Sequence, residues 1–233
     1  MKATGILYGV GLGPGDPELL TVKAVNAIQD SQVIVYLTNE QGQSYARRIV
    51  APWIRAGQEE IPVFMPMDRE RQRAIQVYDD LSIVLADKLT QGKIVSVLCE
   101  GDPFFYGSFI YIYERLNQDF NCRVIPGISA LHAVSAMAET PLTRLDANMT
   151  VVTARESDEK LKSVFQQHDC VVILKVSSQL QRIIGLIRQS DRLADGIYAE
   201  YLTQDKQQLY HDLSQVMDEK APYFSLILLA AKR

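Results

Sequence analysis

Two short glycine-rich segments, each placed directly after an apolar run, constrain the fold more than any other feature of the chain. The apolar runs at residues 6–10 and 94–98 are typical of buried strands. They lead into GVGLGPGDPELLT (residues 9–21) and CEGDPFFYG (residues 99–107), and helical periodicity follows both. Strand, loop and helix in this order predict a parallel sheet, whose carboxyl-end loops bind ligands. A fold that brings the two loops together makes one pocket.

The spacing within the first loop excludes the two common phosphate-binding motifs. A dinucleotide fingerprint needs a third glycine that opens a helix, but Pro14 occupies that position and Pro17 delays the helix. No Gly-Lys-Ser/Thr sequence follows, which excludes a P-loop. Because Asp16 would repel a pyrophosphate, the loop favours a less anionic ligand.

Alternating strand and helix patterns predict an α/β protein with two lobes. In the first half we expect strands at residues 6–10, 33–36, 94–98 and 123–125, and helices at 20–29, 44–54, 69–91, 108–116 and 128–138. In the second half we expect strands at residues 149–154, 171–176, 197–201 and 224–231, and helices at 158–167 and 179–188. The polar, turn-rich stretch 141–148 predicts a boundary between domains 1–142 and 143–233.

The composition narrows the class of protein. A net charge of −4 argues against a nucleic-acid partner. No apolar run approaches the length of a membrane span, and the N-terminus lacks a signal-peptide profile, so we expect a cytoplasmic protein without a membrane partner. Three scattered cysteines without C-x-x-C spacing indicate neither a disulfide framework nor a zinc site.

A third segment, RVIPGISALHAVSAMAETPL (residues 123–142), completes a family pattern. Together with GxGPGDP near the start and GDPxxYG near residue 100, it makes the whole chain resemble the tetrapyrrole (corrin/porphyrin) methylases, which use S-adenosylmethionine. The segment LCEGDPFFYGSFIYIYERL (residues 98–116) is similar to the branch that methylates C-20 of precorrin-2 or of its cobalt-loaded counterpart, on the route to vitamin B12. Other branches more often have glycine where Glu100 stands.

The resemblance implies two α/β domains with S-adenosylmethionine in the cleft between them, a tetrapyrrole substrate and a homodimer. The cofactor contacts that it implies are Leu12, Pro14, Gly101, Asp102, Phe105, Ser129, Ala130, Leu174, Lys175 and Ile197. Several of these residues also have plain structural interpretations. Asp102 could build the turn before a proline, Phe105 could fill the core, and Ser129 could cap a helix.

Lys175 departs from the family pattern, since related branches often carry methionine at or beside this position. An ammonium next to a sulfonium is unfavourable. We therefore expect Lys175 to turn away from the sulfonium or to meet a carboxylate of the substrate.

Methyl transfer from a sulfonium is an in-line displacement that depends on alignment and on exclusion of water more than on an acid or a metal. We predict no metal site, and the sequence names no catalytic residue. A proton must leave C-20 after the transfer. By its location, Glu100 is a candidate for the base that takes this proton. An equal interpretation is that its carboxylate only accepts hydrogen bonds from N–H groups of the loop.

A substrate with many carboxylates requires local basic groups in a net acidic chain. The candidates are Arg47, Arg48, Arg144 and Arg155. The cluster Arg69, Arg71 and Arg73 is typical of a solvated helix start, although its charge would oppose the helix dipole there.

Alternatives of two classes stay open at this point, one enzymatic and one without catalysis. The chain could be another tetrapyrrole methylase, acting at a different ring carbon, or a diphthine-synthase-like enzyme that modifies a protein. It could also be a metabolite-binding α/β protein without catalysis. The loop with Glu100 favours the C-20 branch, without deciding between metal-free precorrin-2 and cobalt-factor II.

Overall fold

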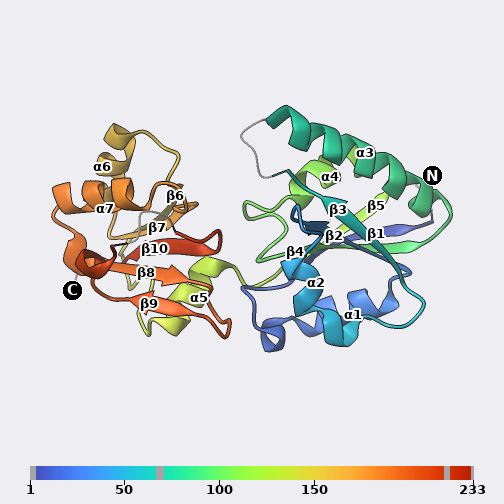
Figure 1. Cartoon of the computed structure of the whole chain (residues 1–233), viewed down its shortest axis with the longest axis horizontal. Helices are drawn as coiled ribbons and strands as arrows, with labels where there is room; N and C mark the ends of the chain where they lie inside the picture. Colours follow the sequence, from blue (N-terminus) through green and yellow to red (C-terminus); the bar gives the residue numbers. More distant parts are fainter. Residues whose placement is uncertain (1–3, 67–70, 218–220, 232–233) are drawn as a thin grey trace. The chain divides into compact units, whose positions relative to one another are not determined.

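The computed structural model describes residues 4–66, 71–217 and 221–231. Two compact units make up the chain, Met1–Ser129 and Ala130–Arg233 (Figure 1). The structure thus divides the chain between Ser129 and Ala130, before the boundary predicted after residue 142. The polar stretch 141–148 marks a turn inside the second unit, because helix α5 (Ala130–Met137) already belongs to that unit.

The first unit is built on an all-parallel sheet with the strand order β3-β2-β4-β1-β5. Its strands are β1 (Ile6–Gly11), β2 (Val33–Thr38), β3 (Glu59–Phe64), β4 (Ile94–Cys99) and β5 (Asn121–Ile125). Four of them lie where the hydrophobic runs predict strands. The exception is β3, which the sequence did not indicate.

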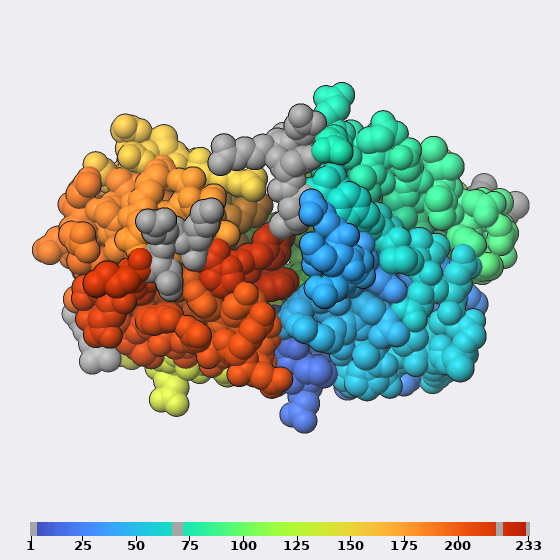
Figure 2. Space-filling view, in the orientation of Figure 1, coloured from blue at the N-terminus to red at the C-terminus, as the bar shows by residue number. Residues whose placement is uncertain are grey.

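Helices cover both faces of this sheet, and each face has its own apolar core. On one face α1 (Val22–Asp30) and α2 (Tyr45–Ile49) enclose a buried cluster that includes Leu12. On the other face lie α3 (Arg71–Thr90) and α4 (Phe109–Leu116), joined by a stacked pair of tyrosine rings, Tyr78 and Tyr111, with centroids 4.8 Å apart. In Figure 2 α3 forms the upper surface of this unit and the segment around α2 the lower one.

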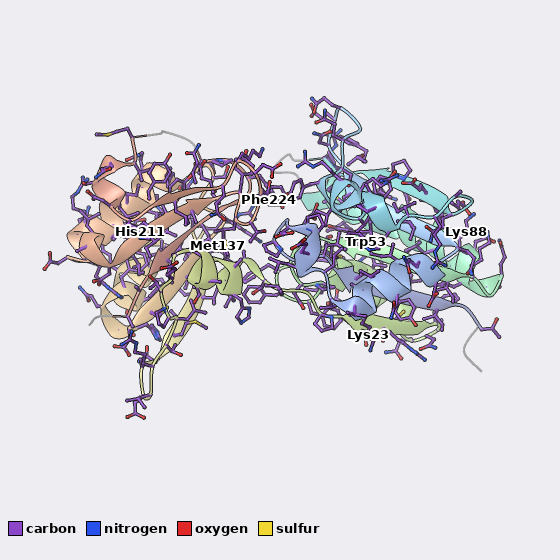
Figure 3. All side chains as sticks on the ribbon, turned by 90° about the horizontal axis from the view of Figure 1, so that it is seen from below. Lys23, Trp53, Lys88, Met137, His211 and Phe224 are labelled. Atoms are coloured by element: carbon purple, nitrogen blue, oxygen red, sulfur yellow. The ribbon has the colours of Figure 1, made fainter. Side chains whose placement is uncertain are left out.

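The predicted helix at 44–54 is shorter in the structure. Helix α2 ends at Ile49, and a 3₁₀ turn, Ala51–Trp53, follows it. Pro52 explains the break, since its ring removes an N–H donor and clashes with the preceding helical turn. Trp53 then packs against the core under α1 and α2 (Figure 3).

The second unit is built on a mixed sheet with the order β6-β7-β10-β8-β9. Strands β6 (Met149–Thr153) and β7 (Cys170–Leu174) are parallel. The remaining strands, β8 (Gly196–Glu200), β9 (Gln208–Tyr210) and β10 (Ser225–Leu229), pair with antiparallel neighbours. The very short β9 was not predicted.

One face of the second sheet carries α6 (Asp158–Gln167) and α7 (Leu180–Gln189) over a core that includes Phe165 and Tyr198. Figure 1 shows α5 on the opposite side of this sheet. Within the described residues, no helix is long and apolar enough to cross a membrane.

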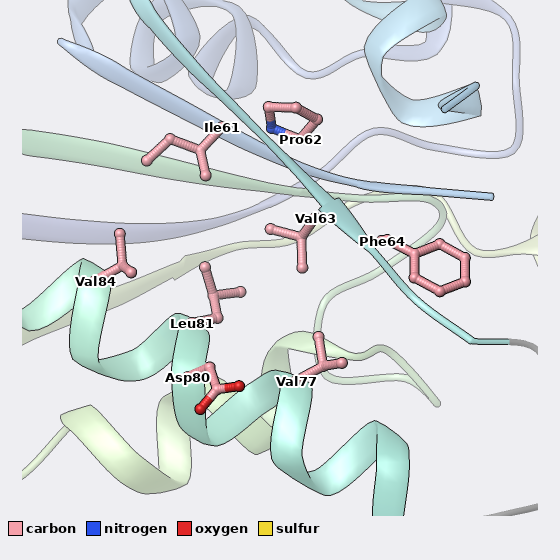
Figure 4. A pocket seen from close by; sticks show the side chains of 8 residues that line it. All are labelled: Ile61, Pro62, Val63, Phe64, Val77, Asp80, Leu81 and Val84. Carbon is pink, nitrogen blue, oxygen red and sulfur yellow. The ribbon is translucent and has the colours of Figure 1, made fainter. Parts of the chain in front are cut away.

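Strand β3 forms an edge of the first sheet and one wall of an apolar groove of about 300 Å³ against α3 (Figure 4). The groove is lined by Ile61, Pro62, Val63, Phe64, Val77, Asp80, Leu81 and Val84. Strand β2 separates β3 from β4. None of the residues predicted to bind the cofactor lines the groove.

Candidate functional site

Three loops meet at the carboxyl edge of the first sheet. They follow β4, β1 and β5, which are adjacent strands, and they consist of residues 100–107, 12–16 and 126–129. These are the three segments that carry the sequence motifs. Because parallel strands end at the same edge, a β-loop-α repeat brings motifs together that are far apart in the sequence.

Backbone hydrogen bonds tie the first two loops to each other. The N–H of Leu12 donates to the carbonyl of Cys99 at 2.9 Å. Beyond it, Gly13 and Gly101 exchange two bonds, of 3.3 Å from the N–H of Gly13 and 2.8 Å from the N–H of Gly101. Both glycines have positive φ, 74° and 70°, a conformation that side-chain-bearing residues rarely adopt. The glycines of the motif are therefore needed for this link.

The third loop packs against the other two without room for a side chain. A Cβ atom on Gly127 would lie 2.1 Å from the carbonyl oxygen of Gly101, and one on Gly11 would lie 2.4 Å from the nitrogen of Gly127. Gly127 was not among the residues predicted for the site. Its juxtaposition with Gly101, far away in the sequence, was the missing information.

Asp102 joins the second and third loops through its side chain. Its Oδ2 accepts the N–H of Gly127 at 3.1 Å, and its Oδ1 accepts the N–H of Phe104 at 2.8 Å. Both carboxylate oxygens therefore bind backbone. In this structure Asp102 is a positioning residue that fixes the loop conformation, and its predicted contact with the cofactor stays a prediction.

Glu100 points to the start of α2, where its Oε1 accepts the N–H of Ala46 at 3.2 Å. Burial raises the pKa of this carboxyl above its ordinary value, although the bonds from backbone N–H groups oppose the shift. Burial and the neighbouring Glu100 also raise the pKa of the Cys99 thiol. Cys99 is therefore an inert small side chain in the core rather than a nucleophile.

Aromatic side chains follow Asp102. The rings of Phe105 and Tyr106 are nearly perpendicular, with centroids 5.1 Å apart. Phe105 is half-buried, whereas Tyr106 is 48% exposed and has a φ of 56°. A non-glycine residue in this left-handed region is uncommon and costs free energy, which is typical of loops shaped for a ligand.

The remaining residues that the first unit contributes to the predicted set are Pro14, which is half-buried, and Ser129, which is 6% exposed. Ala130 is the first residue of α5 and belongs to the second unit. The first N–H groups of a helix have no partner within the helix. They are suited to a carboxylate or hydroxyl oxygen.

Leu174, Lys175 and Ile197 lie in the second unit. Leu174 is the last residue of β7 and Ile197 the second of β8. Both point to the sheet face opposite α6 and α7, because their neighbours Ile173 and Tyr198 face the core on the helix side. The register sets Leu174 level with Ala199, since Leu226 pairs with both. Ile197 is two residues before Ala199 in β8, so it lies further inside the sheet than Leu174, away from the edge that carries Leu174 and Lys175.

The candidate basic residues have different surroundings. Arg47 forms an ion pair with Glu60, and the guanidinium of Arg48 lies 4.6 Å from the ring centroid of Tyr45. Arg144 and Arg155 are exposed. From the cluster at the start of α3, Arg69 and the side chain of Arg71 lie outside the described residues.

The charges of the loops fit a cationic ligand better than a phosphate. Asp16 and Asp102 lie in the first two loops, and no lysine or arginine occurs in residues 9–21 or 99–107. Asp16 also caps the short turn that follows it by accepting the N–H of Glu18 at 2.8 Å. Among the described residues, no group of three or more His, Cys, Asp or Glu side chains could hold a metal ion.

A model of the Tetrapyrrole (Corrin/Porphyrin) Methylases matches residues 6–216. A protein of Sinorhizobium named precorrin-2 C(20)-methyltransferase is 34% identical over 97% of this chain and 95% of its own length. The cobalamin biosynthesis protein CobIJ of Mycobacterium tuberculosis is also 34% identical, over 100% of this chain. The chain spans about half, 47%, of the length of that protein.

Solved structures have the same fold. A cobalt precorrin-4 methyltransferase superimposes with a TM-score of 0.78 at 21% identity, over 97% of this chain and 94% of the other. A uroporphyrin-III C-methyl transferase from Thermus thermophilus, in complex with S-adenosylhomocysteine, gives 0.70 at 22% identity, over 97% and 92%.

Proposed function

Because this chain belongs to the tetrapyrrole (corrin/porphyrin) methylases, we propose that it transfers a methyl group from S-adenosylmethionine to C-20 of precorrin-2 or of cobalt-factor II, in cobalamin biosynthesis. The observation that carries the proposal is the junction of the three motif loops. Their glycines and Asp102 build one rigid edge on the first unit. The similarity to the Sinorhizobium protein over nearly the full length of both chains supports the choice of the ring position.

The residues present fit S-adenosylmethionine. The glycine contacts leave a backbone surface without side chains, and Asp16 and Asp102 favour the positive charge of a sulfonium. We assign the cofactor to Leu12, Pro14, Gly101, Asp102, Phe105, Ser129, Ala130, Leu174, Lys175 and Ile197. Bound there, S-adenosylmethionine supplies a methyl group that its sulfonium already activates for displacement.

The task of the chain is positioning rather than activation of a nucleophile. The backbone of the three loops orients the ligands. Because contacts between neighbouring loops already fix its conformation, the loops reorganise little when a ligand binds. The aromatic group of the site, Phe105, helps to exclude water.

Loss of the proton from C-20 needs an acceptor. Glu100 fits this role because burial raises the pKa of its carboxyl towards that of a competent base. Its bond to the N–H of Ala46 fixes the orientation of the carboxylate. We propose Glu100 for this step, with positioning of the loop against α2 as its alternative role.

The ring position is the specific part of the proposal. A methylase that acts at another carbon would share the three loops, so the fold by itself supports either reaction. The test is an anaerobic assay with ¹³C-methyl-labelled S-adenosylmethionine, in which precorrin-2 and cobalt-factor II are offered side by side. We expect one of them to gain a label that NMR assigns to C-20. A label at another carbon would overturn the ring position, and no transfer to either compound would overturn the substrate.

We further propose that the protein works as a cytoplasmic homodimer, as the family resemblance implies. Analytical ultracentrifugation at micromolar concentration gives the mass directly. A single species with the mass of one chain contradicts the dimer.

A further inference from the structure

Two basic side chains lie at one edge of the second sheet. Arg155 follows β6 and Lys175 follows β7, and these two strands are parallel neighbours. The last residues of the strands, Thr153 and Leu174, are paired, and the N–H of Ala154 donates to the carbonyl of Leu174 at 2.8 Å. The register therefore brings the two cations to the same edge.

The loop that carries Arg155 is fixed by another arginine. Arg182 of α7 donates at 2.8 Å to the carbonyl of Ala154 and at 2.8 Å to that of Glu156, the residues on either side of Arg155. Asp158 in turn accepts a bond of 2.8 Å from Nε of Arg182. The backbone of Arg155 is thus held without the use of its own side chain.

The acidic groups of this loop are occupied by other cations. Glu156 pairs with Lys160 at 2.9 Å, and Asp158 pairs with Arg182. Arg155 is exposed, and within the described part of the chain no carboxylate lies within salt-bridge distance of it. The positive charge of Arg155 is therefore not neutralised by the fold.

Lys175 is held in an unfavourable state at the same place. Its φ of 60° lies in the left-handed region, which costs free energy for a residue with a side chain. Partial burial, and then the charge of Arg155, keep the pKa of the Lys175 ammonium below its ordinary value. The left-handed backbone of Lys175 does not stabilise the fold, and the exposed charge of Arg155, which no described carboxylate neutralises, lies beside it. Together these observations indicate a ligand.

We propose that Arg155 and Lys175 together form a binding site for a carboxylate group of a ligand. The inference deepens the proposed function and rests on it, since both molecules of that reaction carry carboxylates. One source is the acidic side chains of the tetrapyrrole, and the other is the methionyl end of the cofactor. A planar guanidinium beside an ammonium offers several charge-assisted donors to such a group.

The test compares three variants of the full chain: Arg155→Met, Lys175→Met and, as the control, Arg188→Met. Arg188 is an exposed arginine near the end of α7 that has no ion pair within the described part of the chain. Calorimetric titration with S-adenosylhomocysteine measures the affinity for the cofactor and so tests whether its carboxylate is the one bound. The KM for the methylated substrate and fluorescence titration with uroporphyrin III, used as a polycarboxylate probe, measure the tetrapyrrole source.

We expect Arg155→Met and Lys175→Met each to lower the affinity for one of the two ligands about tenfold, which corresponds to the loss of one charge-assisted contact. Arg188→Met should lower the affinity for neither ligand. The affected ligand identifies the source. Each variant should still unfold in one cooperative transition above the temperature of the titrations, so that weaker binding cannot be ascribed to unfolding. Unchanged values on every probe in both variants overturn the site. Absence of methyl transfer by the wild type overturns the proposed function instead, and leaves the two titrations to decide the site.

Discussion

The two units fix the loops at their sheet edges in different ways. In the first unit backbone meets backbone, through Gly13, Gly101 and the side-chain-free contact of Gly11 with Gly127. In the second unit long side chains do the same work, since Arg182 and Arg192 reach across to carbonyl groups. The first arrangement leaves no side chain between the loops, whereas the second holds the backbone on either side of Arg155 and leaves the Arg155 side chain exposed.

Arg192 is the strongest example of the second kind. It is 1% exposed, and its guanidinium donates to the carbonyls of Phe165, His168, Asp169 and Ala230, with Asp195 as its counterion at 2.8 Å. Phe165 lies in the last turn of α6, His168 and Asp169 follow that helix, and Ala230 follows β10. One buried side chain thus joins the end of a helix to the end of the sheet.

The largest expected effect on stability is that of Arg192→Met. The variant leaves four carbonyl groups and one carboxylate without their donor in a buried place, and we expect it to lose about 3–5 kcal/mol of unfolding free energy. Urea denaturation followed by circular dichroism measures this loss. Arg188→Met, exposed on the same unit, is the control and should unfold like the wild type. Equal stabilities of the two variants would show that Arg192 is not the anchor described here.

The corresponding break in the first unit is Gly127→Ala. The added Cβ would overlap the carbonyl oxygen of Gly101, so the loops must separate. We expect a loss of about 1–3 kcal/mol in stability from overpacking. Displacement of the loops should also lower kcat/KM by about 100-fold.

Gly185→Ala is the matched control for this prediction. A Cβ at that position in α7 meets nothing within 4 Å. Because alanine is the better helix former, the control should gain about 0.5–1 kcal/mol and keep full activity. If Gly127→Ala retains wild-type turnover, the close contact of the loops has no part in catalysis.

A smaller effect is expected for Asp102→Ala. The substitution removes one side-chain acceptor from the N–H of Gly127 and one from the N–H of Phe104. We expect a stability loss of about 1–2 kcal/mol, as for the loss of a cap, with a weaker affinity for S-adenosylhomocysteine. Calorimetry with this ligand gives the second quantity. Unchanged affinity in a folded variant would remove Asp102 from the support of the cofactor site.

The smallest expected effect sharpens the role of Glu100. Its folded-state pKa is raised, so the folded protein binds more protons than the unfolded chain between the ordinary carboxyl pKa and the raised value. The contribution of Glu100 to the free energy of unfolding therefore falls as the pH rises from the ordinary carboxyl pKa to the raised pKa. Glu100→Gln keeps an acceptor for the N–H of Ala46 and should melt higher than the wild type at pH 7, with a difference that shrinks towards acid pH.

Two observations complete this prediction. Glu114→Gln, an exposed substitution on α4, is the matched control and should melt like the wild type. If Glu100 is the proton acceptor, the stable Glu100→Gln variant should also lose turnover while it still binds S-adenosylhomocysteine. Full turnover would leave Glu100 with the positioning role.

Much of the first unit was predictable because its constraints are local in the sequence. Apolar runs gave its central strands, and the glycines and prolines marked the loops after them. Strand β3 escaped because it begins with Glu59 and Glu60 and contains Pro62, a sequence unlike a central strand. The edge position allows it: the N–H groups of Glu59 and Met65 bond towards β2, so the missing N–H of Pro62 faces away from the sheet.

The anchors of the second unit were not predictable in this way. Nothing in the local sequence around Arg182 or Arg192 says that each will bind carbonyl groups more than twenty residues away. Likewise, no local signal shows that α5 groups with the second unit, which begins at Ala130, before the polar stretch 141–148. Such contacts depend on the tertiary arrangement of whole elements.

We propose above all that the three loops of the first unit bind the cofactor. Hydrogen exchange of the wild-type protein, measured by mass spectrometry with and without saturating S-adenosylhomocysteine, tests it most directly. We predict slower exchange in peptides that cover residues 11–16, 100–107 and 126–131, with no comparable change around β3 and the groove beside it. If saturating S-adenosylhomocysteine adds no protection in these three loops, the cofactor does not bind there.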